Sequence, residues 1–317
     1  MLTAALYIHM RGTSLEGRMD PNPDQSIAQS HSMLVVADKD LNPVLFDHLL
    51  TQKWKVEYVS SNEEALSQLR KSRYDLILTA EGTSAKEDIR LLQQIRVAQP
   101  HVRMIILTRE STTEDVLMAL RQRAFSFFSP PYTVERLTEM IHMAMEGPAW
   151  DDGIELVSGT PVWVRLLVRC DRKTAERLMQ FFEEMVDVPD EEKNEIAYAF
   201  REMLINAMNY GGKFDPQQYV EISYFRTRHA VACRVKDPGE GFSLEELYHA
   251  AVKNPSDDPF RHIPVREAFG LPPGGFGILL SLHLVDELIY NEQGNEVLLV
   301  KYLNPERRPQ RADVKVV

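Results

Sequence analysis

The stretch that decides the fold of the C-terminal half reads Glu-Met-Leu-Ile-Asn (residues 202–206) and lies in a run that predicts a helix from Asp190 to Tyr210. Glu202 and Asn206 are four residues apart, so both side chains project from one helical face, one turn above the other. A carboxylate and a carboxamide in this arrangement also occur as ordinary solvated polar residues. The pair alone therefore does not define a site.

Two glycine-rich turns lie further along the chain. The first, Asp-Pro-Gly-Glu-Gly-Phe (237–242), comes directly after the apolar run 230–235, and its glycines permit a tight turn close to a ligand. The second, Gly-Gly-Phe-Gly (274–277), opens the apolar run 278–285, which predicts a helix. Free amides and the positive end of the dipole at such a helix start favour a phosphate.

The segment 243–273 between these turns is unusually long for a plain connection. It carries several prolines together with Lys253, Arg261 and Arg266. Such a segment is typical of a mobile lid. Strands at 154–157, 162–170, 219–225, 230–235 and 297–302, with helices at 173–186 and 190–210, predict an α+β sandwich for this half of the chain.

Taken in order, Glu-x-x-x-Asn, Asp-x-Gly-x-Gly and Gly-Gly-x-Gly resemble the Bergerat ATP-binding fold shared by histidine kinases, gyrases and related proteins. The preceding strand pair and helix, with Asn206-Ala207 just before Tyr210-Gly211, most resemble the anti-sigma-factor serine kinases over residues 155–303. The chain departs from that subgroup in having Tyr210 where histidine is common, and in its longer lid. The departure puts the catalytic rate in doubt but not nucleotide binding.

The resemblance implies a role for each matching residue, with ATP and Mg²⁺ as cofactors. Asn206 would ligate magnesium, and Glu202 would take the proton from an incoming serine hydroxyl or water. Asp237 would accept a hydrogen bond from the adenine amino group. The backbone would approach the base at Gly239 and Gly241. It would present amides to the phosphates at Gly275 and Gly277. The lid cation would be Arg266, with Arg261 as the alternative.

The N-terminal half alternates five short apolar runs with five amphipathic stretches. The runs are 33–37, 56–59, 75–79, 104–108 and 125–128, and this rhythm predicts a doubly wound five-stranded parallel sheet. The helix starts have capping-box spacing at Ser61/Glu64, Ser84/Glu87 and Ser111/Glu114. We therefore expect an α/β chain with a parallel-sheet domain first and the α+β sandwich second.

This half resembles the receiver domain of bacterial response regulators. The resemblance places the acidic pair at Ala37 and Asp38, so one of two metal-binding carboxylates is missing. It places alanine, Ala80, at the phospho-acceptor position, next to Glu81, which strand alternation would aim elsewhere. Thr108 keeps the switch hydroxyl, whereas Pro130 replaces the lysine. We expect a pseudo-receiver that contacts a partner or dimerises rather than taking a phosphoryl group.

Composition and charge narrow the function classes. A net charge of -11 and a pI near 5.4 disfavour nucleic acid as a direct partner. No apolar run is long enough for a membrane span, and Cys170 and Cys233 indicate buried free thiols in a reducing compartment, so we expect a cytoplasmic protein. The predicted parts are a flexible leader (1–31), the pseudo-receiver (32–148), the histidine-kinase-like ATPase domain (149–306) and a tail (307–317).

Three functions remain open. The first is a serine/threonine kinase of the anti-sigma type that phosphorylates an antagonist protein, with a sigma factor as a further partner and a homodimer as the form common among similar proteins. The second is a non-catalytic, ATP-gated protein-binding module. The third, a histidine kinase, needs an accepting histidine on a helical hairpin before the ATPase domain, and His142 is merely the nearest upstream histidine.

Overall fold

The computed structural model describes residues 31–37, 54–145, 152–243, 245, 247–255, 257–304 and 314–316. Residues from His31 onward form one compact unit. The predicted leader (1–31), except for His31, and the stretch that contains Asp38 and the first expected helix lie outside the described residues. No helix in the described part of the chain is both long and apolar enough to cross a membrane.

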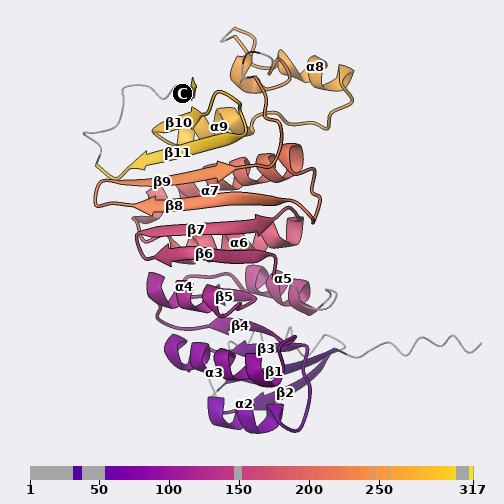
Figure 1. Ribbon diagram of the computed structural model, residues 1–317, viewed down its shortest axis with the longest axis vertical. Helices are drawn as coiled ribbons and strands as arrows, with labels where there is room; N and C mark the ends of the chain where they lie inside the picture. Colours follow the sequence, from indigo (N-terminus) through magenta and orange to yellow (C-terminus); the bar gives the residue numbers. More distant parts are fainter. Residues whose placement is uncertain are drawn as a thin grey trace, which may run out of the picture. The chain divides into compact units, whose positions relative to one another are not determined.

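The first domain is a five-stranded parallel sheet in the order β2-β1-β3-β4-β5 (Figure 1). Its strands are β1 Ser32–Val36, β2 Lys55–Val59, β3 Leu76–Thr79, β4 Arg103–Leu107 and β5 Ser126–Phe128. Its described helices are α2 Asn62–Leu69, α3 Ala85–Ala98, α4 Thr113–Arg121 and α5 Val134–Met145. The expected doubly wound parallel sheet is confirmed.

The apolar strand runs are buried because helices cover both faces of the sheet. Side chains from α2, α3 and α4 pack against one face, and α5 packs against the other. Ser61 and Ser84 cap their helices by accepting hydrogen bonds from the amides of Glu64 and Glu87, as predicted. The third cap was predicted one residue early: α4 begins after Thr112, whose side chain forms a reciprocal capping box with Asp115.

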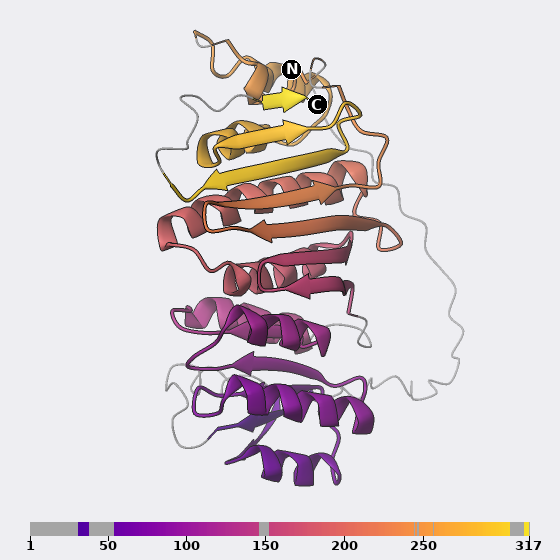
Figure 2. The same ribbon diagram turned by 60° about the vertical axis from the view of Figure 1, so that its left-hand side comes forward.

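The second domain is a seven-stranded sheet in the order β12-β10-β11-β9-β8-β7-β6 with helices on one face (Figures 1 and 2). The strands are β6 Ile154–Thr160, β7 Trp163–Arg169, β8 Tyr219–Arg226, β9 Ala230–Lys236, β10 Glu287–Tyr290, β11 Glu296–Tyr302 and β12 Val314–Val316. The helices are α6 Arg172–Met185, α7 Asp190–Asn206, the 3₁₀ turn η3 Ala251–Lys253, α8 His262–Ala268 and α9 Gly277–Leu284. The predicted α+β architecture is confirmed.

Three features of this domain differ from the sequence prediction. Helix α7 ends at Asn206 and continues as a π-helical turn, η1 Ala207–Gly211, in which the Gly212 amide donates to the Ala207 carbonyl at 2.9 Å. Strand β10 was not predicted because it spans only four residues between a helix and a turn. Strand β12 pairs in parallel with β10 inside the segment expected to be a tail.

Candidate functional site

A cavity of about 850 Å³ opens where α7, the turn after β9, the lid and the start of α9 meet. This volume lies within the range of small-molecule sites. All eight residues proposed from the sequence line it: Glu202, Asn206, Asp237, Gly239, Gly241, Arg266, Gly275 and Gly277. Tertiary folding thus brings together positions that are up to 75 residues apart in the chain, and their individual roles stay predictions.

Glu202 and Asn206 face the first turn of α9. A Cβ atom on Gly277 would lie 2.5 Å from Glu202 Oε2 and 3.5 Å from Asn206 Nδ2, so a larger residue here would displace the Glu202 carboxylate. Among the residues that the structure describes, neither the carboxylate of Glu202 nor the carboxamide of Asn206 has a hydrogen-bond partner. Two polar groups that face a cavity without partners are suited to bind a ligand.

Glu202 is half-buried, and its environment changes its acidity. Burial raises the pKa of its carboxyl above the ordinary value, because loss of water disfavours the charged form, and the neighbouring Arg201 opposes this by lowering it. A carboxylate whose pKa is moved toward neutrality holds a transferred proton more firmly. The direction of this shift is the one that favours a general base.

Asp237 lies at the opposite wall, at the end of β9. Its Oδ1 accepts a hydrogen bond of 2.8 Å from the Gly239 amide, while burial raises the pKa of the carboxyl. A Cβ on Gly211 would lie only 2.1 Å from Asp237 Oδ1, so the π-helical turn after α7 can pass the carboxylate only with glycine at this position. The Asn295 side-chain amide donates to the Gly239 carbonyl at 3.2 Å and holds the turn in place.

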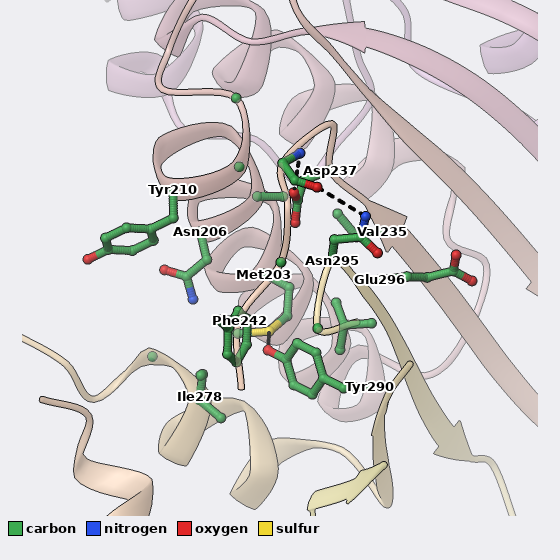
Figure 3. Close-up of a pocket in the computed structure, with 18 of the residues that line it drawn as sticks. Met203, Asn206, Tyr210, Val235, Asp237, Phe242, Ile278, Tyr290, Asn295 and Glu296 are labelled. Carbon is green, nitrogen blue, oxygen red and sulfur yellow. Dashed lines mark hydrogen bonds between the residues drawn. The ribbon is translucent and has the colours of Figure 1, made fainter. Parts of the chain in front are cut away.

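Apolar side chains surround the polar groups. Figure 3 shows Met203, Phe242, Ile278 and Tyr290 around the cavity, with the carboxamide of Asn206 directed toward Phe242 and Ile278. The rings of Phe242 and Tyr290 meet edge to face, with centroids 5.3 Å apart, and Tyr290 donates a hydrogen bond to Met203 Sδ at 3.3 Å. Such a lining can hold a flat aromatic group beside Asp237.

Lid residues 243–273 contain the 3₁₀ turn η3 and the helix α8; the buried His262 attaches the lid to the second glycine turn, and the buried Arg266 joins two parts of the lid. His262 is fully buried, with Nδ1 2.6 Å from Asn254 Nδ2 and Nε2 3.1 Å from the Gly274 carbonyl. Arg266 donates to the carbonyl of Pro272 at 2.8 Å through one terminal nitrogen and to the carbonyl of His249 at 3.1 Å. Because three of its nitrogens donate hydrogen bonds to lid carbonyls, Arg266 holds two parts of the lid together.

The structure favours Arg266 over Arg261 as the cavity-lining arginine, because Arg261 is exposed and is not part of the lining. It also adds residues that sequence reasoning missed. Lys213 lines the cavity from an exposed position in the left-handed region, with φ of 53°. Lys213 follows the second of two glycines, which could have marked a tight turn, but no local pattern distinguishes Asn295 or Tyr290 from ordinary sheet residues.

In the first domain, the structure describes four residues at or beside the positions expected to carry receiver chemistry. Ala80 follows β3 and is buried, with 1% of its surface exposed. Glu81 accepts a hydrogen bond from the Tyr132 hydroxyl, and Thr108 donates its hydroxyl proton to the Glu110 carbonyl at 3.1 Å. The peptide bond between Pro130 and Pro131 is cis. In this region the described carboxylates serve the protein's own hydrogen bonds.

Comparison with protein-family models divides the chain into the same two domains. Residues 169–301 match the model of the histidine kinase-like ATPase domain, and residues 33–142 match the response regulator receiver domain. The chain therefore joins a receiver domain to a histidine-kinase-like ATPase domain. This combination of domains supports an ATP-binding regulatory protein of signal transduction, and the ATPase domain suggests a kinase-like use of ATP.

The curated relatives match part of the chain. The chain is 29% identical over 142 residues to the transcriptional regulatory protein GlrR of Escherichia coli K12, a match that covers 44% of this chain and 32% of that protein. It is 26% identical over 106 residues to the transcriptional regulatory protein RprY of Bacteroides fragilis, across 33% of this chain and 45% of that protein. The chain thus spans about a third to a half of the length of these relatives.

Solved structures similar to the chain are also receiver domains. A CheY-like receiver domain from Methanospirillum hungatei is 20% identical, with a TM-score of 0.33, and covers 37% of this chain and 94% of that one. The activated receiver dimer of NtrC4 is 19% identical, also with a TM-score of 0.33, and covers 36% and 96%.

Proposed function

We propose that this protein is a magnesium-dependent serine/threonine protein kinase of the anti-sigma-factor type, which acts on an antagonist protein in the cytoplasm of a bacterium. The observation that supports this most directly is the meeting of Glu202, Asn206 and Gly277: a half-buried carboxylate and an unpartnered carboxamide, each within a few ångströms of the start of α9. A sigma factor as a further partner and a homodimeric state belong to the same proposal.

The residues of the cavity fit ATP and Mg²⁺. Asn206 offers the hard oxygen ligand that magnesium prefers, and the start of α9 borders the same space. Asp237, beside the ring of Tyr290 and the side chain of Met203, is placed to accept a hydrogen bond from an adenine amino group. When bound, ATP with its magnesium supplies the transferable phosphoryl group and neutralises part of its charge.

Within this arrangement, the protein's own residues have separate tasks. Glu202 accepts the proton of an incoming serine or threonine hydroxyl, for which its raised pKa is suited. Asn206, one turn further along α7, would hold the magnesium ion. It would thereby orient the phosphate end of the nucleotide. The lid, which His262 holds to Gly274 and which Arg266 braces internally through the carbonyls of Pro272 and His249, excludes water from the space between Glu202 and Asn206.

The test is incubation with γ-labelled ATP, magnesium and a candidate antagonist protein. We expect label on a serine or threonine of the antagonist, and a loss of transfer by about 10²–10⁴-fold in Glu202→Ala with ATP binding retained. Glu191→Gln, an exposed carboxylate in the first turn of the same helix, is the matched control and keeps full activity. Tight ATP binding without any transfer in the wild type would reject the kinase.

The alternative is a non-catalytic ATP-gated binding module, and two observations favour it. Tyr210 lines the cavity where the subgroup commonly has histidine, and Figure 3 shows its ring directed away from the other labelled side chains. In addition, the buried His262 attaches the lid to Gly274, and the buried Arg266 braces the lid internally. This function predicts ATP-dependent capture of the partner protein, no release of ADP, and no effect of Glu202→Ala on capture.

We further propose that the receiver domain works by contact and takes no phosphoryl group. Its support is the buried methyl group of Ala80 at the acceptor position and the engagement of Glu81 by Tyr132. Incubation with acetyl phosphate and magnesium should leave the mass of the protein unchanged. A stable adduct of one phosphoryl group within residues 32–148 would overturn this proposal.

A further inference from the structure

Helix α9 packs antiparallel against α7, with contacts in matching order along the two helices. The start of α9 at Gly277 lies beside Glu202, near the end of α7. One turn further along α9, the Ser281 hydroxyl lies 3.5 Å from the carbonyl oxygen of Ala199, and both residues are fully buried. Two small residues at this contact let the helices approach closely. The position of α9 along α7 therefore decides where its first turn lies.

The far end of α9 is held by a lysine from the sheet. Lys301 Nζ donates to the carbonyl of Leu284, the last residue of α9, at 2.9 Å, and it pairs with Glu195 Oε2 of α7 at 2.5 Å. The last carbonyls of a helix have no partner within the helix, and a cation is favoured at this negative end of the helix dipole. One ammonium group thus joins the end of α9 to α7.

Lys301 occupies a core position of β11. The alternate residues Val297, Leu299 and Lys301 are buried, and only 4% of the lysine is exposed. A charged group in such a position requires partners. A well-packed apolar side chain of similar volume is often as stabilising as a buried ion pair. Stability alone therefore does not account for a lysine at this position.

The opposite end of α9 borders the cavity. It begins without a side-chain cap, whereas α2, α3, α4 and α6 each begin after a capping side chain. The lid is attached directly before it: the Ala251 amide donates to the Gly275 carbonyl at 2.9 Å, and His262 Nε2 lies 3.1 Å from the Gly274 carbonyl. A lid that moves would pull on the start of α9, and a fixed point at the other end of the helix opposes that displacement.

From these contacts we propose that Lys301 is a positioning residue for the phosphates of the nucleotide. It fixes the end of α9 to α7 and thereby sets the place of the first turn of α9 beside Glu202 and Asn206. It acts through the helix, which is eight residues or about 12 Å long, and touches no ligand itself. This inference rests on the proposed binding of ATP at the start of α9, and it does not require phosphoryl transfer.

The experiment compares the full wild-type chain with Lys301→Met by competition against a fluorescent ATP analogue in the presence of Mg²⁺. The competitors are ATP, ADP and adenosine. Methionine keeps an unbranched apolar side chain and removes the ammonium group. We expect the affinity for ATP and ADP to fall about five- to tenfold, as when a hydrogen bond to a charged group is lost. The affinity for adenosine, which has no phosphate to meet α9, should change by less than about twofold.

Two further variants separate positioning from folding. Glu195→Gln keeps an oxygen acceptor for Lys301, so we expect a loss of only about twofold for ATP. Lys301→Arg again offers donors to both partners and should regain most of the ATP affinity. If Lys301→Met does not fold, the double variant Glu195→Gln/Lys301→Met takes its place, because it removes both charges of the pair and leaves neither unpaired.

The matched control is Lys315→Met, which removes an exposed lysine that pairs with Glu287 at 2.8 Å and leaves all three affinities in place. Equal losses for ATP and adenosine, or a lower melting temperature with unchanged ATP affinity, would show an ordinary structural ion pair and overturn the proposal. Wild-type ATP binding without phosphoryl transfer rejects only the kinase. An absence of nucleotide binding in the wild type rejects both.

Discussion

The two domains treat their polar side chains in opposite ways. In the ATPase cavity, the carboxylate of Glu202 and the carboxamide of Asn206 have no partner in the described part of the protein and face open space. In the receiver domain, Glu81 receives the Tyr132 hydroxyl, and the buried Asp88 accepts hydrogen bonds from Asn62 at 3.0 Å and Thr83 at 2.7 Å. Both domains thus place acidic side chains near the ends of helices or strands. Of the acids named here, only Glu202 in the ATPase domain is left without a hydrogen-bond partner.

The difference separates a binding site from a scaffold. Burying a polar group without a hydrogen-bond partner lowers the stability of the fold. Such a group is therefore expected where a bound ligand supplies the missing partner. A scaffold instead satisfies its polar groups internally. We therefore expect substitutions in the cavity to change function more than stability, and substitutions at the receiver acids to change stability alone.

After Glu202→Ala, the largest effect is expected from Gly277→Ala. The new Cβ would lie 2.5 Å from Glu202 Oε2, so the carboxylate must move away from the start of α9. We expect phosphoryl transfer to fall by about ten- to a hundredfold, with a weaker loss of ATP affinity and little change in melting temperature. Gly270→Ala is the control, since its Cβ meets no atom within 4 Å and only its φ of 65° is strained. Equal activity of both variants would contradict the proposed approach of α9 to Glu202.

A smaller effect, on stability only, is expected from Asp88→Asn. Burial raises the pKa of Asp88 to about 6, against hydrogen bonds from Asn62 and Thr83 that lower it. An acid with a raised folded pKa favours folding at low pH. This contribution is lost as the pH rises from about 4 to about 6, and it amounts to about 3 kcal/mol.

Asp88→Asn should therefore flatten the pH dependence of the free energy of unfolding between pH 4 and pH 7, as measured by urea titration, while ATP affinity stays unchanged. Glu114→Gln, an exposed acid at the start of α4, serves as the control and keeps the wild-type slope. An unchanged slope in Asp88→Asn, or a loss of ATP binding, would show that Asp88 is not a scaffold residue.

The smallest effect is expected from Tyr132→Phe. The hydroxyl is half-buried and donates to Glu81, and burial together with that carboxylate raises the pKa of the phenol. Its removal leaves Glu81 able to reach solvent, so we expect a loss of about 1 kcal/mol in the free energy of unfolding and no change in phosphoryl transfer. A gain of phosphorylation from acetyl phosphate in this variant would show that Tyr132 masks an acceptor, and the comparison between the domains would fail.

Much of the architecture could be predicted from local patterns. Alternating apolar runs predicted the parallel sheet, and capping residues predicted helix starts at Ser61 and Ser84, because these depend on residues close in the chain. The prediction failed where local signals compete or are short. Ser111 and Thr112 both suit a cap, and the reciprocal bond with Asp115 selects Thr112. The four residues of β10 give too short a pattern to stand out.

The sequence by itself determined which residues could bind a nucleotide, since the spacing of Glu202 and Asn206 and the two glycine turns are local facts. It also determined that Cys170 and Cys233 are buried and free. Only the tertiary structure decided that Arg266 holds the lid, that Lys213 borders the cavity, and that Lys301 joins the end of α9 to α7. These depend on side chains meeting across long sequence separations, and such meetings are set by packing rather than by local pattern.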